Sequence, residues 1–309
     1  MRRAIVITLA ILMTLGGGML FAAGQSEEDG EEVRIGLAVS TLANPFFVDL
    51  ADGAEEAAEE LGVELTVVDS EDDSSREADN MQDLIQQQVD VLLVNPTDAE
   101  AIVPSIQQAN SQDIPVITLD RSAEGGEVIS HIASDNVAGG EMAAEHLIEL
   151  IGGEGRVVEL EGIPGASAAR ERGEGFNNVV GENDSIEVVA QQTANFDRSE
   201  GLDVFQNVLQ ATDDIDGVFA HNDEMILGAI EAADSAGVLD DMVFVGFDAI
   251  DDAISAIEDG NLDATIAQQP AMIGRLGVEA AVEYLDTGEI ESSIPVELEL
   301  VTPDNVDDF

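Results

Sequence analysis

Short apolar runs alternate with amphipathic stretches from Val33 onward, and this alternation limits the fold of the chain more than any other feature. Apolar runs without polar alternation are typical of strands that are buried on both faces. Strands that alternate with helices form a parallel sheet whose faces are covered by those helices. In the first part of the chain, strands are predicted at Val33–Val39, Val63–Val68, Val91–Val94, Val116–Leu119 and Val128–Ala133, and helices at Phe46–Leu61, Arg76–Gln88 and Ala99–Ser111.

The same alternation starts again after Asp135. Strands are predicted at Val157–Leu160, Ile186–Ala190, Gly217–Ala220 and Val243–Phe247, and helices near Val137–Ile151, Ala168–Val180, Ser199–Ala211, Glu224–Ala236 and Ile250–Glu258. The pattern therefore predicts an α/β protein with two doubly wound parallel-sheet units that meet close to Ser134 and Asp135.

The charge of the chain is strongly negative. It carries 66 Asp and Glu against 10 basic residues, all of them Arg, for a formal net charge of −56. Such a charge repels phosphate backbones, which argues against nucleic-acid binding as a main activity. The carboxylates are spread along the whole chain, and at 1 M salt the Debye length of about 3 Å screens their mutual repulsion. The sequence therefore predicts a halophilic protein that works in brine.

Residues 1–24 have the pattern of a secretory signal peptide. Arg2 and Arg3 precede an apolar run, a glycine triplet breaks it, and Ala22-Ala23-Gly24 offers small residues for cleavage. The uncharged stretch is just long enough to span a bilayer, so an uncleaved anchor is the alternative. Residues 25–32 form an acidic linker. The chain has no Cys, which excludes disulfides and lipid attachment through an N-terminal Cys. We expect export to a periplasm.

No constellation of catalytic residues is recognisable. His131, His146 and His221 lie far apart without metal-ligand spacing, and neither a nucleophile elbow nor a Walker loop is present. The glycine-rich stretch 152–155 lies between a helix and a strand, where a plain turn is the better interpretation, because phosphate loops run from strand to helix. The sequence predicts a protein that is not an enzyme and that uses no cofactor and no metal.

Polar and aromatic residues follow several of the predicted strands, where ligands of doubly wound sheets bind. Asn44-Pro45-Phe46-Phe47 opens the first helix, and Asp120-Arg121 directly follows VITL. Arg and Asp together suit vicinal hydroxyls, and Phe suits the apolar face of a sugar ring. From the sequence alone, either both Phe rings belong to the core or one points outward. A neutral polyol is the ligand that fits these residues and the negative charge.

Several stretches closely resemble one protein family over nearly the whole chain, from about Val33 to Val301. They are VSTLANPFFVDLADGA, NPTDAEA, IPVITLDR, GEVISHIASDNVAGG, GIPGASAARERGEGF, FDRSEGLDV, HNDEMILGAI, VGFDA and ATIAQQP. The sequence resembles the periplasmic ribose-binding proteins of ABC sugar importers. The resemblance implies the type I periplasmic binding protein fold, in which two lobes joined by a three-segment hinge close over the sugar.

The resemblance also implies domain boundaries and crossover points. Residues 33–134 plus 269–297 would form the N-terminal lobe, and residues 135–268 plus 298–309 the C-terminal lobe. The crossovers would lie near Ser134-Asp135, near Gln268 and near Val296–Leu298.

The ligand-binding residues of the family match ten residues of this chain in type. They are Asn44, Phe46, Phe47, Asp120, Arg121, Arg172, Phe196, Asn222, Asp248 and Gln268. Ala43 and His221 depart from the usual family residues, Asn and Gln, without removing a ligand-binding side chain. Arg170 and Arg198 have no direct sugar role in the family, so pairing with carboxylates is the favoured interpretation.

The implied function is capture of D-ribose and its delivery to the permease of an ABC transporter. A chemoreceptor is a second potential partner, and a monomer is expected. One alternative keeps this role for allose, galactose or autoinducer-2. Another is a repressor-like sugar-sensing domain, but a signal-like segment and an acidic spacer occupy the place of its DNA-binding headpiece.

Overall fold

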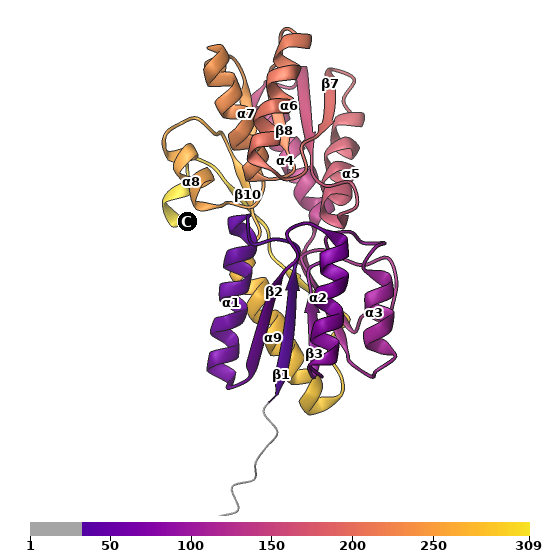
Figure 1. Cartoon of the computed structure of the whole chain (residues 1–309). Helices are drawn as coiled ribbons and strands as arrows, with labels where there is room; N and C mark the ends of the chain where they lie inside the picture. Colours follow the sequence, from indigo (N-terminus) through magenta and orange to yellow (C-terminus); the bar gives the residue numbers. More distant parts are fainter. Residues whose placement is uncertain (1–32) are drawn as a thin grey trace, which may run out of the picture. The chain divides into compact units, whose positions relative to one another are not determined.

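The computed structural model describes residues 33–309. The predicted signal peptide and acidic linker lie outside the described residues. The described part contains two parallel sheets, each flanked by helices (Figure 1). No described helix is both long and apolar enough to cross a membrane.

The first sheet has six strands in the order β11-β5-β4-β3-β1-β2, and every neighbouring pair is parallel. Its strands are β1 (Arg34–Val39), β2 (Glu64–Asp69), β3 (Val91–Val94), β4 (Val116–Leu119), β5 (Ser130–Ser134) and β11 (Ser293–Val296). The two central strands β3 and β4 are buried along their whole length, as their unbroken apolar sequences predict.

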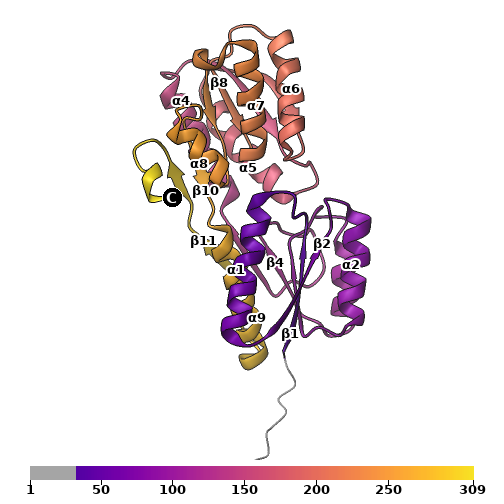
Figure 2. The ribbon, with the colours of Figure 1, turned by 60° about the vertical axis from the view of Figure 1, so that its left-hand side comes forward.

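Two pairs of helices cover this sheet. They are α1 (Pro45–Leu61) with α9 (Pro270–Thr287), and α2 (Ser74–Gln86) with α3 (Val103–Asn110). Successive residues of β1 point to opposite faces, and Leu37 packs in the cluster with α1 and α9 while Ala38 packs with α2 and α3. Figure 2 shows α1 and α9 side by side, away from α2. We call this sheet and its four helices the first lobe.

The second lobe is built around a four-stranded parallel sheet in the order β7-β6-β8-β9. Its strands are β6 (Gly155–Glu161), β7 (Ile186–Thr193), β8 (Gly217–Ala220) and β9 (Val243–Val245), with an antiparallel pair of β10 (Thr265–Ala267) and β12 (Glu299–Val301). Its helices are α4 (Asn136–Leu150), α5 (Ser167–Gly181), α6 (Arg198–Ala211), α7 (Asp223–Ala236) and α8 (Asp251–Glu258), with short 3₁₀ turns η1 (Leu239–Asp241) and η2 (Val306–Asp308). Within this lobe, α4 packs along α5 and α6 packs along α7.

The chain passes between the lobes at three places. It leaves the first lobe between β5 and α4, returns between β10 and α9, and leaves again between β11 and β12. These passages coincide with the crossovers predicted near Ser134-Asp135, Gln268 and Val296–Leu298. The two-lobed α/β architecture is therefore confirmed.

Most predicted elements are present, with shifted ends. The helix predicted over Ala99–Ser111 starts wrongly, because residues 99–102 form turns and the helix begins at Val103, next to a proline that suits a first turn. The strand predicted over Val243–Phe247 ends at Val245, since the chain turns away at Asp248, whose φ is 120°. The glycine-rich stretch 152–155 is a turn between α4 and β6, as predicted.

Candidate functional site

Asn44 begins α1 and places two phenylalanines at the end of β1. Its extended backbone makes it the N-cap, and its Oδ1 accepts a hydrogen bond from the backbone N–H of Phe46 at 2.9 Å. Phe46 and Phe47 are only 2% and 3% exposed, and their rings meet edge to face with centroids 5.1 Å apart. The sequence left open whether both rings belong to the core or one points outward. In the structure neither ring points to solvent, and both line an internal cavity.

Asp120 and Arg121 follow β4 and are almost fully buried. Asp120 has a φ of 60°, which is uncommon for a residue other than glycine, and its Oδ2 accepts from Asn95 Nδ2 at 3.2 Å. The Arg121 guanidinium lies 4.9 Å from the ring centre of Phe47 and 5.2 Å from that of Phe196. Burial lowers the pKa of Arg121, and nearby Asp120 opposes this effect. Arg121 thus contacts aromatic rings of both lobes.

Arg172 is the corresponding cation of the second lobe, and it lies on α5. Its Nε donates to Asn136 Oδ1 at 2.8 Å, and its Nη1 donates to the backbone oxygen of His221 at 2.5 Å and to Asp248 Oδ1 at 3.4 Å. The guanidinium also lies 3.9 Å from the ring centre of Phe247. A cation with three acceptors and an aromatic face beside it is held in one orientation.

Asp248 and Gln268 form a second buried pair at the ends of β9 and β10. Gln268 Nε2 donates to Asp248 Oδ1 at 2.6 Å. Burial raises the pKa of Asp248 well above its usual range, Arg172 opposes this, and Asp223 and Asp120 add to it. Gln268 does not itself line the cavity; it contacts the cavity residue Asp248 from behind the wall.

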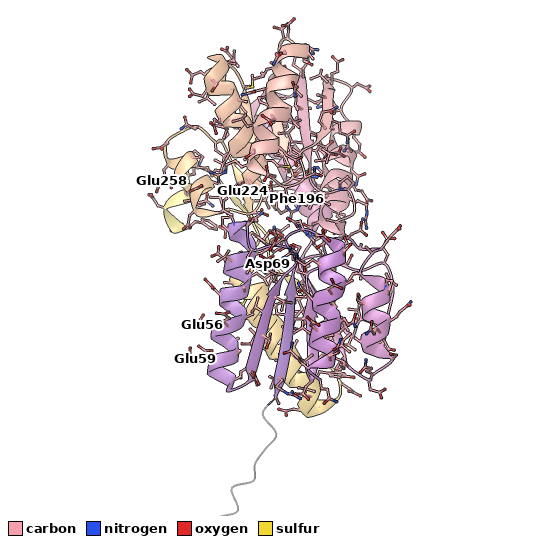
Figure 3. The ribbon with its side chains drawn as sticks, in the orientation of Figure 1. Glu56, Glu59, Asp69, Phe196, Glu224 and Glu258 are labelled. Atoms are coloured by element: carbon pink, nitrogen blue, oxygen red, sulfur yellow. The ribbon has the colours of Figure 1, made fainter. Side chains whose placement is uncertain are left out.

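Phe196 comes from the loop between β7 and α6 and takes a strained backbone conformation. Its φ is 62°, which for a bulky residue persists only where the surroundings enforce it. Asn222 Nδ2 donates to its backbone oxygen at 3.3 Å. Position 162 must be glycine, because a Cβ there would lie 2.1 Å from the Phe196 ring. Figure 3 shows Phe196 and Glu224 at the edge of the second lobe, near Asp69 of the first.

These side chains surround one small cavity between the lobes. The structure brings nine of the ten predicted residues to its wall; that they bind a ligand stays a prediction. The residues that line it are Asn44, Phe46, Phe47, Asp120, Arg121, Ala168, Arg172, Phe196, Asn222 and Asp248. Ala168 was not predicted from the sequence, because an alanine methyl group makes no hydrogen bond or charge interaction that would mark it as a cavity residue.

Three buried polar atoms of predicted site residues, two at the cavity wall and one on Gln268 behind it, have no hydrogen-bond partner within the described part of the chain. They are Asp120 Oδ1, Arg121 Nε and Gln268 Oε1. Buried polar groups are nearly always paired with protein or with ordered water, so such atoms are places where a ligand or a water molecule would bond. Two of them accept and one donates, so a ligand that satisfied all three would both donate and accept hydrogen bonds.

The lobes also touch beside the cavity. The backbone N–H of Ser122 donates to Ser167 Oγ at 2.8 Å, and the N–H of Ala99 donates to the oxygen of Gly165 at 3.0 Å. Arg170 pairs with Glu124 of the first lobe at 2.8 Å. The prediction that Arg170 pairs with a carboxylate is confirmed, although the partner lies in the other lobe.

Other residues considered from the sequence have structural surroundings. Arg198 pairs with Glu224 at 2.7 Å and with Asp252 at 2.8 Å, as predicted. His131 Nδ1 lies 2.9 Å from Thr118 Oγ1. Within residues 33–309, no three His, Asp or Glu side chains are grouped so that they would hold a metal ion.

Comparisons with known proteins agree with this geometry. A protein-family model described as "Periplasmic binding protein domain" matches residues 35–290. The ribose import binding protein of Bacillus subtilis is 46% identical over 302 residues, covering 97% of this chain and 98% of its own length. That of Escherichia coli is 48% identical over 290 residues, covering 94% and 97%.

Solved structures show the same fold. An ABC transporter solute binding protein from Bacillus halodurans with bound myo-inositol superposes with a TM-score of 0.87 at 33% identity, covering 91% of this chain and 98% of its own. A periplasmic solute binding protein from Actinobacillus succinogenes with bound D-allose gives 0.85 at 31% identity, covering 90% and 100%. The chain therefore belongs to the periplasmic binding protein family, whose members bind solutes rather than transform them.

Proposed function

We propose that this protein captures D-ribose between its two lobes and delivers it to the permease of an ABC importer. The observation that carries this proposal is the cavity lined by nine of the ten predicted residues, in a chain 45–48% identical to ribose import binding proteins over nearly its full length. The choice of ligand rests on the polar groups and the aromatic rings of the cavity wall.

The polar groups of the wall suit a polyol. Asp120 and Gln268 keep free acceptor atoms and Arg121 keeps a free donor, and each sugar hydroxyl both donates and accepts. The formal charges of two carboxylates, Asp120 and Asp248, cancel those of Arg121 and Arg172. A neutral ligand therefore leaves no excess charge buried when the cavity closes.

The shape of the cavity suits one small ring. Phe47 of the first lobe and Phe196 of the second both lie near the Arg121 guanidinium, with ring centres 4.9 and 5.2 Å from it, and such rings suit the apolar faces of a sugar. The mixture of aromatic and polar groups in the cavity wall favours a monosaccharide over a simple apolar molecule.

Closure of the lobes is the proposed mechanism. We assign residues 33–134 and 269–297 to one lobe and residues 135–268 and 298–309 to the other. Only a closed arrangement lets Asp120 and Arg172 contact the same sugar, so the sugar stabilises that arrangement by its extra affinity for it. The closed form is what a permease, and in a second role a chemoreceptor, would recognise.

The location follows from the same assignment. We propose that residues 1–24 direct the protein to the periplasm, and that the net charge of −56 reflects life in brine. The second point is tested by thermal melting after dialysis from molar to low salt. Lower stability at low salt is expected because repulsion between carboxylates is then less screened; an unchanged melting temperature would overturn the brine assignment.

Calorimetric titration in molar salt with D-ribose, D-allose and D-galactose tests the ligand. One-to-one binding of ribose, at least about tenfold tighter than the other two, is expected, since a hydroxyl of the wrong orientation leaves buried groups unpaired. Tighter binding of allose or galactose would overturn the choice of ribose while keeping the transport role. Absence of heat with all three sugars would contradict the proposed ligand class.

A further inference from the structure

A buried carboxylate and a buried histidine lie directly behind the cavity wall of the second lobe. We propose that Glu159 and His221 form a positioning pair, which holds Arg172 and Phe196 in the geometry that binds the sugar. The proposal rests on the proposed sugar-binding function. It assigns a role in binding to two residues that do not line the cavity.

The hydrogen bonds of His221 determine which nitrogen carries its proton. The backbone N–H of Gly162 lies 3.3 Å from His221 Nδ1 and is a donor only, so Nδ1 must be the acceptor. The proton of the neutral ring therefore lies on Nε2, which donates to Glu159 Oε1 at 2.9 Å. The ring is thus held at both nitrogens, and its side chain is only 1% exposed.

Glu159 is fixed equally firmly. It lies in the middle of β6, it has no exposed surface, and its side chain points toward the α4–α5 face, among apolar residues such as Val157. Asn177 Nδ2 donates to its Oε2 at 3.0 Å, and Gln191 Nε2 donates to the same oxygen at 2.8 Å. A buried carboxylate is costly without such donors, and here donors from α5, from β7 and from His221 compensate for its lost hydration.

Two residues of the cavity wall depend on the position of His221. Its backbone oxygen accepts the 2.5 Å hydrogen bond from Arg172 Nη1. The N–H that its ring accepts belongs to Gly162, the residue on which the Phe196 ring lies. A movement of His221 therefore shifts an acceptor of Arg172 and the support of Phe196 together.

The pair also lies against the helix that carries Arg172. A Cβ on Gly173 would lie 3.2 Å from His221 Cε1 and 3.3 Å from Glu159 Oε1, so α5 packs directly on both side chains. An apolar pair of similar size would fill this space without the cost of burying a charge. What an apolar pair would not supply is the directional hold on the backbone at Gly162 and His221.

Four variants test the proposal: H221L, H221Q, E159Q and H146L. H221L removes both hydrogen bonds of the ring, whereas H221Q keeps a side-chain N–H that reaches Glu159. E159Q keeps the shape of the carboxylate but replaces one acceptor oxygen by a donor. H146L is the matched control, because His146 lies on α4 about 15 Å along the helix from Asn136.

Calorimetric titration with ribose gives the result, and thermal melting shows which variants fold. We expect H221L and E159Q to weaken ribose binding about 10- to 100-fold, H221Q to restore affinity to within about threefold of the wild type, and H146L to leave it unchanged. Rescue by glutamine separates positioning from mere filling of the core. If H221L does not fold, the ribose affinity of E159Q alone tests the proposal.

Wild-type affinity in E159Q, or equal losses in H221Q and H221L, would overturn the positioning pair. The wild-type titration is done first, because absence of ribose binding there contradicts the proposed ligand and not the pair. The variants are then compared with whichever sugar of the ribose, allose and galactose panel the wild type binds.

Discussion

The two lobes differ in how completely their buried polar atoms are paired. Among the described residues, seven buried side-chain atoms lack a hydrogen-bond partner, and six of them belong to the first lobe. The six are Ser40 Oγ, Glu77 Oε2, Thr97 Oγ1, Asp120 Oδ1, Arg121 Nε and Ser130 Oγ, and the seventh, Gln268 Oε1, lies where the chain passes between the lobes. In the second lobe, Arg172 and Glu159 each have three side-chain or backbone partners.

This difference indicates a division of labour. In the second lobe, hydrogen bonds within the protein already hold Arg172 in place, and such preorganisation would lower the entropic cost of binding a ligand. In the first lobe, Asp120 and Arg121 keep unpartnered atoms that a ligand could pair with. Variants of cavity residues in either lobe should therefore lose ribose binding. Those in the second lobe should also lose much of the free energy of unfolding, and those in the first lobe should lose less of it.

The R172A variant should give the largest effect. It removes the cationic partner of Asp248, so that this carboxyl, only 6% exposed, keeps the hydrogen bond from Gln268 but no opposite charge from Arg172. We expect ribose binding to fall at least about 1,000-fold, and the free energy of unfolding to fall by about 3–5 kcal/mol. Calorimetry and urea unfolding measure the two quantities.

The control for this variant is R156A. Arg156 lies at the other end of the second lobe, where its Nε is 3.6 Å from Glu187. Ribose affinity in R156A should match the wild type. Retained ribose affinity in R172A would show that this guanidinium is not part of the site.

The D120A variant should separate binding from stability. One carboxylate oxygen of Asp120 is unpartnered, and the other accepts from Asn95 and lies 3.8 Å from Arg121 Nε, so removal of the carboxylate costs the native protein one hydrogen bond and one long ion pair. We expect at least about a 100-fold loss of ribose affinity with a loss of only about 1–2 kcal/mol in the free energy of unfolding. A stability loss as large as that of R172A would contradict the difference between the lobes.

Glu77 should give the first lobe a pH-dependent stability. Its Oε1 accepts from the Thr97 N–H at 2.8 Å, its Oε2 has no partner in the described structure, and burial raises its pKa to about 7. Between about pH 4.5 and pH 7 the folded state keeps the Glu77 proton while the unfolded state has lost it. The contribution of protonated Glu77 to stability is therefore fully present below about pH 4.5 and is lost as the pH rises through about 7.

The E77Q variant measures this effect. Relative to E77Q, the wild type should lose about 3 kcal/mol in the free energy of unfolding between pH 4.5 and pH 8. Urea unfolding at the two pH values tests it, with E55Q as a control that removes an exposed carboxylate. Parallel pH profiles for the wild type and E77Q would show that Glu77 is not held in its neutral form.

The E124Q variant should have the smallest effect. The Glu124–Arg170 pair joins the lobes, but its side chains are 47% and 43% exposed, so it contributes little in screened solvent. We expect ribose affinity to fall about two- to threefold in E124Q, because in the proposed mechanism opening of the lobes would separate Glu124 from Arg170.

E71Q breaks a comparably exposed pair, to Arg76, within the first lobe alone, and it should leave ribose affinity unchanged. Equal titration curves for E124Q and E71Q would mean that the Arg170 contact does not favour closure.

Much of the fold follows from sequence pattern, but α9, the edge strand β11 and the β10–β12 pair were not predicted. Gly274 and Gly277 interrupt the apolar face of α9, and they do so because the helix packs very closely: a Cβ on Gly274 would lie 1.9 Å from the backbone oxygen of Leu50. The two strands have only three residues each and pair across more than thirty residues of chain, so no local period marks them.

The candidate site was predictable in its residue types and not in its details. Residues that follow strands β1 and β4 meet because parallel strands end at one edge. The positive φ of Phe196, the unpaired atoms of Asp120 and Arg121, and the link from Glu159 to Arg172 depend on contacts between distant segments. No sequence pattern encodes such contacts locally.

In the proposed mechanism, buried polar groups bind a sugar through hydrogen bonds to its hydroxyls. A pair of calorimetric titrations of the wild-type protein in molar salt, one with D-ribose and one with 2-deoxy-D-ribose, tests this directly. The account predicts one-to-one binding of ribose and at least about a tenfold loss for the deoxy sugar, because a missing hydroxyl leaves a buried group unpaired. Equal affinities, or no binding of ribose, would contradict it.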